Sequence, residues 1–371
     1  MKMKTAPRYI LSIVAVTAAA FILSETALNK FLSLSTYSGR NESFSFADFY
    51  ARTASHGIAR MSGELAVVDI GDLDRAGIAA LLDSLSAMQP KAVAIDVFFR
   101  FPGQEGDASL TDAVCLTDGM VLPRDVNHPE LVSFFYDEAT EARFGAVNLS
   151  AATARDVVRS YRPVFDTESG PVEAVGLVLA GQLRPDLAAQ VRQKGATDEF
   201  IRYDGVEFPI FEAEEILSPD ASVAETIRGR AVLVGDLHDP QDMHVTPVDP
   251  EMPGLLIHAK IAQTILSGKP VRQVPRWLVV LIAALVCALF IWIYLIIRDH
   301  KWGKASSLLT RGAQFLLMYA FFNIGYRLYA GPGILLDFSR PMLMLGLGSL
   351  AYDITFGFYD LFTKVLRKKK K

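Results

Sequence analysis

The sequence predicts an α/β fold: a mixed or mostly parallel sheet with flanking helices, joined to one N-terminal and three C-terminal membrane helices. Three observations lead to this prediction. Residues 65–99 read as strand, helix and strand, which is typical of a βαβ unit. Apolar residues make up 51% of the 371-residue chain, and its mean hydropathy is +0.27, which is high for a protein without membrane segments. An acidic middle region lies between two basic, apolar ends.

The charge is strongly segregated along the chain. Residues 31–276 carry 21 basic and 36 acidic side chains, a net charge of −15, although the whole chain has a net charge of only −4. Because an acidic domain repels a polyanion, we expect no nucleic acid among the ligands. The same segregation divides the chain into four regions: an N-terminal membrane anchor or signal peptide (1–30), a globular domain (31–275), a three-helix transmembrane region (277–363) and a basic cytoplasmic tail (364–371).

The N-terminal region has the pattern of an export signal. Three basic residues among the first eight precede an apolar run at 9–23. Both a cleaved signal peptide and a retained membrane anchor fit this pattern. We favour the anchor, because Ala27 and Leu28 extend the apolar segment toward the ~20 residues that a bilayer requires. In either case the residues that follow are exported.

The globular region opens with strand-like runs at 65–70 and 92–99, on either side of a helix-like segment at 78–88. Because such a crossover joins parallel strands, Asp69 and Asp96 fall near the carboxyl ends of two strands of one sheet. Ligands of open α/β sheets bind at those ends. The remaining expected elements are helices at 109–116, 172–183, 212–217 and 255–266, and strands at 120–122, 144–149, 200–203 and 230–234.

Three further apolar segments, 277–297, 312–329 and 342–362, are each long enough for a membrane helix. Basic residues gather in the loop between the first two segments and in the tail, so the positive-inside rule places both, and the N-terminus, in the cytoplasm. Four spans with the acidic domain on the opposite side of the membrane satisfy all three basic clusters. The lipid bilayer is therefore an expected partner.

Polar side chains within the last two spans are candidate contacts with a membrane partner: Asn323, Asp353 and Asp360. An ionised Asp353 near the middle of a span costs at least ~2.5 kcal/mol, so it requires a partner or a proton. Three alternatives fit: a partner within its own bundle, for instance Asn323, a partner subunit, or an ion path. Small residues nearby, such as Gly346 and Gly348, allow close contact between helices.

Acidic and histidine side chains follow three of the expected strands and can converge on one crevice. They are the candidate ligand-binding residues: Asp69, Asp72, Asp96, Asp236, His238, Asp242 and His244. Their spacing matches neither an EF-hand nor an HExxH zinc site, and Asp more often caps helices and turns, so we predict no metal and no cofactor. His258 lies among apolar neighbours at a helical position and is expected to be a core histidine.

No motif of catalysis is complete in the chain. An Asp at the end of a buried strand can act as a nucleophile, and Asp69 has such a position. No phosphate-binding loop, nucleophile elbow or Cys–His pair accompanies it. We therefore expect no catalytic residue and no enzymatic activity.

Three blocks of the chain, VVDIGD (67–72), PKAVAIDVFF (90–99) and AVLVGD (231–236) followed by DMHVTP and MPGLLIHAKIAQTILSG, resemble the CHASE2 family of bacterial extracytoplasmic sensor domains. The resemblance covers residues 64 to about 268 together with the membrane layout. It implies a multi-pass protein of the bacterial inner membrane with its large domain in the periplasm. The chain departs from the family in having no Trp-Pro-Arg-like element at 73–77.

Family members commonly feed a cytoplasmic kinase or cyclase, whereas this chain ends about nine residues after its last expected span. The resemblance therefore implies a sensory or docking module that signals through a separate membrane or cytoplasmic partner protein, and that binds an unknown extracytoplasmic ligand. The alternative is a structural or assembly subunit of a cell-envelope membrane complex that binds no small ligand. A ligand-induced rise in melting temperature favours the sensor, and a constitutive stoichiometric complex favours the subunit.

Overall fold

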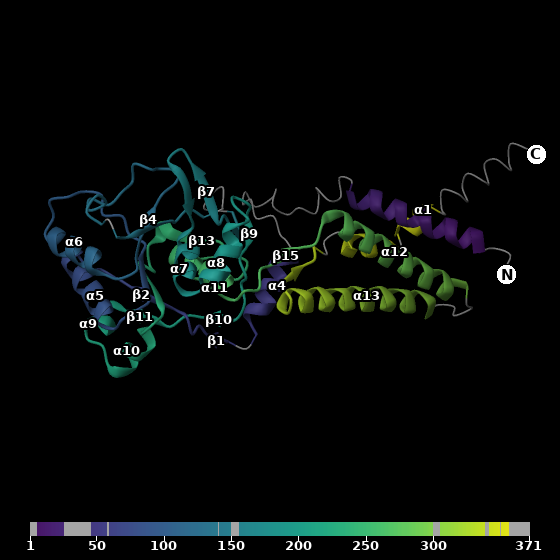
Figure 1. The fold of residues 1–371 in the computed structure, drawn as a ribbon. Helices are drawn as coiled ribbons and strands as arrows, with labels where there is room; N and C mark the ends of the chain where they lie inside the picture. The colour runs from purple at the N-terminus through teal and green to yellow at the C-terminus, as the bar shows by residue number, and fades with distance from the viewer. Residues whose placement is uncertain are drawn as a thin grey trace, which may run out of the picture. The chain divides into compact units, whose positions relative to one another are not determined.

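The computed structural model describes residues 6–25, 46–57, 59–139, 141–149, 156–299, 305–337, 341–348 and 350–355. The chain forms two compact units, which are described separately (Figure 1). The globular unit is Ala51–Val271, and the helical unit combines Met1–Tyr50 with Arg272–Lys371.

The globular unit is built on a six-stranded sheet in which every pair of neighbouring strands is parallel. This sheet confirms the predicted α/β class. The strands, in spatial order, are β11 (Ile210–Glu212), β2 (Leu65–Asp69), β12 (Ala231–Gly235), β3 (Ala92–Ile95), β4 (Met120–Arg124) and β5 (Arg143–Ala146). Within this sheet β12 comes last along the chain, and it is inserted between β2 and β3.

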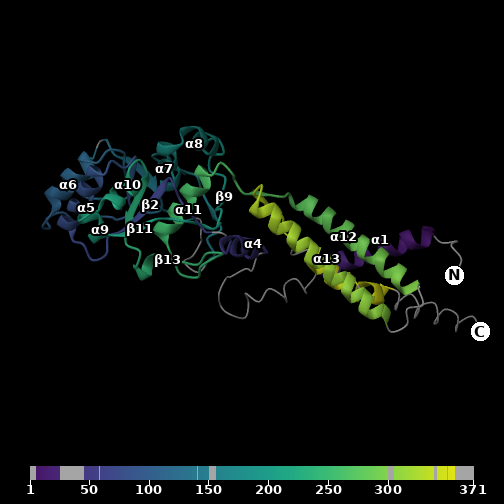
Figure 2. The same ribbon diagram turned by 90° about the horizontal axis from the view of Figure 1, so that it is seen from below.

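Helices cover both faces of the sheet. On one face lie α5 (Arg75–Ala87), α6 (Asp107–Leu116), α9 (Ala213–Leu217) and α10 (Ala221–Ile227), and Figure 2 shows the first three of them close together. Alternate strand residues, such as Val68 and Val234, point into the buried cluster beneath these helices. On the other face lie α7 (Val175–Leu183), α8 (Pro185–Arg192) and α11 (Gly254–Leu266).

The close packing of α7 against α11 depends on Gly176. A Cβ at this position would lie 2.8 Å from Cγ2 of Ile261 and 3.0 Å from the backbone nitrogen of Ala262. The two helices therefore approach so closely that only a residue without a side chain fits between them.

Most of the expected helices are present, with shifted bounds. The predicted helix at 172–183 begins at Val175, because β8 (Gly170–Glu173) forms a hairpin with β7 (Val164–Thr167) just before it. The predicted strand at 200–203 is only β9 (Glu199–Phe200), and it pairs with β6 (Ser160–Tyr161) outside the main sheet. Other short elements are α4 (Phe46–Ser55), β1 (Arg60–Met61), β10 (Val206–Glu207), η1 (Pro240–Asp242), β13 (Met243–His244) and β14 (Met252–Pro253).

The helical unit contains α1 (Ala6–Glu25), α12 (Arg276–Asp299) and α13 (Ala305–Ala330). Both α1 and α13 pack against α12, and a buried cluster that includes Val16, Phe290 and Met344 lies among these helices and the helical residues 341–348. A short parallel bridge joins β15 (Arg272–Gln273), just before α12, to β16 (Ile334–Leu335), just after α13.

The expectation of four membrane helices is corrected by the structure. In the part of the chain that the structure describes, one helix, Arg276–Ile297, is long and apolar enough to cross a membrane by length and composition. The apolar part of α1 is the shorter segment Ser12–Ile22. Helix α13 is long, but polar residues such as Gln314 and Arg327 interrupt it. The expected span at 342–362 lies partly outside the described residues.

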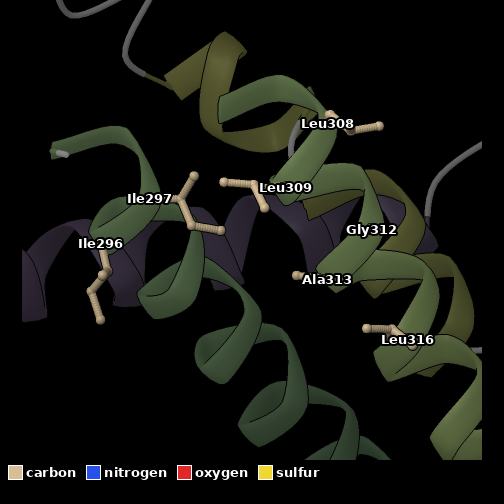
Figure 3. Close-up of a pocket in the computed structure, with 7 residues that line it drawn as sticks. All are labelled: Ile296, Ile297, Leu308, Leu309, Gly312, Ala313 and Leu316. Carbon is tan, nitrogen blue, oxygen red and sulfur yellow. The ribbon is translucent and has the colours of Figure 1, made fainter. Parts of the chain in front are cut away.

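A groove between α12 and α13 is lined only by apolar residues. It has a volume of about 630 Å³ and lies where the end of α12 meets the start of α13 (Figure 3). Leu308 and Leu316, which line it, are 75% and 65% exposed. Such an aliphatic surface is costly in water, because apolar area exposed to water carries about 25 cal/mol per Å².

Candidate functional site

The candidate site lies at the carboxyl edge of the three central strands. Asp69 is the last residue of β2, Asp236 follows β12 and Asp96 follows β3. These strands are parallel neighbours, with Gly235 opposite Asp69 in the ladder. The carboxylates that the sequence places after separate strands therefore share one edge of the sheet.

Asp69 is a buried connection between two loops. Its side chain is 1% exposed, and its Oδ1 accepts hydrogen bonds from the backbone nitrogens of Gly71 and Leu237, each at 3.2 Å. Its Oδ2 lies 3.1 Å from Nε2 of His238, whose side chain is 79% exposed. Asp69 therefore ties the loop after β2 to the loop after β12, and its carboxylate is satisfied within the fold.

A second group of side chains, the acid–histidine cluster, consists of Asp96, Asp242, His244 and His258. His258 belongs to α11 and is buried, and its Nε2 lies 3.8 Å from Oδ2 of Asp96. The Nε2 atom of His244 lies 3.2 Å from Oδ1 of Asp242. The buried Nδ1 of His244 has no hydrogen-bond partner within the described residues. The cluster thus brings together two carboxyl groups and two imidazoles from three parts of the chain.

The cluster lies against the N-terminus of α11. The first residue of this helix is Gly254, and a Cβ at this position would overlap the Asp242 carboxylate. Glycine at 254 therefore leaves the space that the carboxylate occupies. Because the N-terminus of a helix carries partial positive charge, an ionised Asp242 is favoured there. The residue before α11 is Pro253, and its side chain makes no capping hydrogen bond to the start of the helix.

Burial changes the proton affinity of two members of the cluster. Burial and, to a smaller extent, the charge of Asp242 raise the pKa of Asp96 to about 7. Burial, with a smaller contribution from His244, lowers the pKa of His258 to about 4, although the charge of Asp242 opposes the shift. Near neutral pH, His258 is therefore neutral, and Asp96 is poised to gain or lose a proton.

The other aspartates of these loops mostly brace the backbone. The Oδ1 atom of Asp236 accepts a hydrogen bond from the backbone nitrogen of His238 at 2.7 Å. Asp74 caps α5 through the backbone nitrogen of Gly77 at 2.8 Å. Asp72, which the sequence suggested as a ligand-binding residue, is exposed and lies outside the acid–histidine cluster.

Sequence reasoning missed the role of His258 in this arrangement. The residue is buried, as expected of a core histidine, but it faces the carboxyl group of Asp96. The signal was its position one helical turn after Gly254, which places it near the start of α11 and hence near the edge of the sheet. The apolar neighbours of His258 in the sequence indicated a core residue and gave no sign of a contact with Asp96.

The cluster is suited to holding a proton. No group of three or more His, Cys, Asp or Glu residues in the described ranges has an arrangement that could hold a metal ion. The acid–histidine cluster places two carboxyl groups and two imidazoles at one helix end, and burial changes the proton affinity of Asp96 and His258. A change of its charge therefore acts directly on the start of α11.

The candidate membrane contacts are separate from this site. The side chain of Asn323 donates a hydrogen bond to the backbone oxygen of Tyr319 at 2.8 Å, and none joins it to Asp353, which is also described. Asp353 lies on the exposed side of the helical residues 350–355, together with Leu350 and Ile354. Asp360 lies outside the described residues.

Comparison with known families gives one result. A family model described as the CHASE2 domain matches residues 54–297, about two thirds of the chain. The match contains the whole carboxyl edge of the sheet, the acid–histidine cluster, α11 and most of α12. The curated proteins and the solved structures contain no match to the chain.

Proposed function

The chain belongs to the CHASE2 family, and on that premise we propose that it is a membrane-anchored extracytoplasmic sensory module that signals through separate partner proteins. The observation that carries the proposal is the path of the chain from the acid–histidine cluster to the membrane. Helix α11 begins at this cluster and ends at Leu266, and α12 begins at Arg276. Only residues 267–275 separate the two helices.

This path gives a change at the sheet edge a short route to the membrane. A proton or ligand that alters the charge beside Gly254 changes the most favourable position of α11, because a helix N-terminus responds to nearby charge. Gly176 holds α11 tightly against α7, so α11 moves as a packed body rather than by local bending. The short connection then transmits that movement to α12.

The helices α1 and α13 accompany α12 into the bilayer in this proposal. Both pack on α12, and the exposed aliphatic groove between α12 and α13 is matched by lipid chains better than by water. The basic residues near both ends of the chain support the multi-pass topology that we propose, in an inner membrane with the globular domain outside the cytoplasm.

Asp353 is the contact that we propose for a partner protein. It lies on an exposed helix face beside Leu350 and Ile354, where a carboxyl group in lipid requires a polar partner. Gly346 is exposed on the same face and allows a second helix to approach closely. Asn323 and Asp360 are the other proposed contacts.

The test is co-purification of the full chain from its native membranes in mild detergent. We expect at least one membrane or cytoplasmic protein to be recovered with the wild type, and Asp353→Leu to reduce its recovery at least ~10-fold, the effect of about 1.4 kcal/mol. Asp353→Asn, which keeps a polar group, should retain more of the partner. Recovery that is equal for all three proteins, with intact folding, contradicts the role of Asp353.

The alternative function is an assembly subunit of an envelope complex. It predicts a stoichiometric complex whose amount does not change with pH or added small molecules. The sensory proposal predicts that the recovery of the partner changes when the charge of the acid–histidine cluster is altered, for instance by Asp96→Asn. A complex that is indifferent to this substitution and to every small molecule favours the assembly subunit.

A further inference from the structure

A polar cleft lies at the carboxyl end of β4, away from the acid–histidine cluster. It has a volume of about 660 Å³, which is enough for a small metabolite. Its lining includes two arginines, Arg124 and Arg162, and two acidic residues, Asp166 and Glu168. One wall is the end of β4 and the loop after it, and another is the hairpin of β7 and β8.

The wall formed by the loop after β4 is held in place by hydrogen bonds. The Oδ1 atom of Asp125 accepts hydrogen bonds from the backbone nitrogens of Asn127, at 2.8 Å, and His128, at 3.1 Å, and from the side chain of Asn148, at 2.8 Å. Asn148 in turn accepts a hydrogen bond from the backbone of Val126 at 2.8 Å. Burial alone would raise the pKa of Asp125, but these bonds together outweigh it and lower the pKa, so the carboxylate stays ionised and keeps the loop fixed.

The two arginines of the cleft differ in their partners. Arg162 donates from Nε to Oδ1 of Asp198 at 2.8 Å, so its charge is balanced by a carboxylate. Arg124 donates to the hydroxyl of Ser169, a neutral group, at 3.0 Å. None of the ion pairs of the described residues includes Arg124. Its guanidinium is thus positioned by the hairpin while its charge remains available to a ligand.

The charges around the cleft select the class of ligand. Arg124 offers a fork of donors that matches a carboxylate. Asp166 and Glu168 line the same cleft, and with Asp198 they outnumber the two arginines, so a polyanion such as a phosphate ester is repelled. A molecule with one carboxylate and one ammonium group satisfies both signs of charge. Phe165, over which the guanidinium of Arg162 lies at 6.0 Å, adds an apolar surface for a side chain.

We propose that this cleft binds a small zwitterion of the amino-acid class, with Arg124 holding the carboxylate and Asp166 or Glu168 the ammonium group. This inference rests on the proposed sensory function and names the ligand that the module would detect. The position agrees with the rule that open α/β sheets bind ligands outside the carboxyl ends of their strands, since Arg124 is the last residue of β4.

The experiment measures binding of individual L-amino acids to the full chain in lipid nanodiscs by calorimetry. Each amino acid is compared with the matched carboxylic acid that lacks the amine, as alanine with propionate, and with inorganic phosphate. We expect at least one amino acid to bind and its matched acid to bind ~10-fold more weakly or worse, because each lost charge-assisted hydrogen bond weakens binding by about this factor. Phosphate should not compete.

Two variants test the role of Arg124. Arg124→Gln should weaken binding of the amino acid by at least ~10-fold. Arg143→Gln is the matched control, because Arg143 is exposed at the opposite end of the neighbouring strand β5. It should change the affinity by less than ~2-fold. Melting curves without ligand establish that the variants fold. The combined change Asp166→Asn and Glu168→Gln removes both candidate carboxylates for the ammonium group, and it should weaken binding of the amino acid but not of the matched acid.

Several results overturn the proposal: no amino acid binds, the matched acid or phosphate binds equally well, or Arg124→Gln and Arg143→Gln behave alike. These results are distinct from a failure of the sensory function. If another compound class binds independently of Arg124 and changes partner recovery, the sensory function stands and only the ligand class is wrong. If nothing binds and the partner complex is constitutive, both fail.

Discussion

Asp96→Asn is predicted to stabilise the globular unit, and to do so only at neutral and alkaline pH. The folded protein raises the pKa of Asp96 from 3.8 to about 7, mainly through burial. The folded state therefore holds this proton more tightly than the unfolded chain. The contribution of Asp96 to stability is full below about pH 4 and is lost as the pH rises through about 7. Asparagine carries no titrating proton, so the variant escapes this loss.

The magnitude follows from the size of the shift. About three pH units at about 1.4 kcal/mol per unit give ~4 kcal/mol as an upper limit above the folded pKa. Solvent reaches 19% of the Asp96 side chain, so we expect about half of this value, ~2 kcal/mol. In a unit of 221 residues, Ala51–Val271, this corresponds to a rise in melting temperature of about 4–8 °C.

The assay is thermal unfolding of the full chain in detergent at about pH 4 and about pH 8.5, followed by circular dichroism. Tryptophan fluorescence is unsuitable, because Trp277, Trp292 and Trp302 all lie outside the globular unit. Asp72→Asn is the matched control, since it removes an exposed carboxylate at the same sheet edge.

We expect the difference between Asp96→Asn and the wild type to be near zero at the lower pH and to reach its full size at the higher pH. The other titratable groups that face Asp96, namely Asp242, His244 and His258, are present in both proteins. A difference that is the same at both pH values, or a variant that is less stable at about pH 8.5, would refute the assignment of a raised pKa to Asp96.

Three further predictions concern α11. Burial lowers the pKa of His258 to about 4. The stability that the neutral His258 contributes is therefore present above about pH 6.5 and is lost as the pH falls through about 4. His258→Leu should abolish this loss, which is up to ~3 kcal/mol, in the same melting series. Gly254→Ala should destabilise the domain by ~1–3 kcal/mol in denaturant unfolding, because its Cβ overlaps Asp242, and Asp242→Ala should relieve most of the cost. Gly176→Ala should cost at least as much by separating α7 from α11, with no relief from Asp242→Ala.

The class of the fold could be predicted from the sequence because its signals are local. The β-branched runs that form β2, β3 and β12 are buried over their whole length, as is typical of strands in a parallel sheet with helices on both faces. The insertion of β12 between β2 and β3 could not be predicted, since the order of strands depends on packing between distant segments. The hairpin of β7 and β8 could not be predicted either, because its short strands are only partly buried and have little apolar periodicity.

The candidate site was predictable only in part. Carboxylates after parallel strands must meet at one edge, so the approach of Asp69, Asp96 and Asp236 follows from the sequence. The partners of each carboxylate do not follow, because they depend on α11. This helix brings His258 to Asp96, whereas Asp72 lies at the surface. The polar cleft at Arg124 also escaped prediction, since its walls come from segments about 40 residues apart in the chain.

Asp69, which is buried, and Asp96, which is partly buried, differ in what they contribute to the stability of the fold. Asp69 has a structural explanation, because two backbone amides that follow different strands require its Oδ1 atom. Asp96 has no such explanation: the nearest histidine nitrogen is 3.8 Å away, beyond hydrogen-bond distance, and ionisation of Asp96 at neutral pH weakens the fold. An apolar residue would pack there at less cost. A costly acid beside the helix that leads to the membrane is typical of a functional group, which is why Asp96 rather than Asp69 is the residue on which the sensory proposal should be tested first.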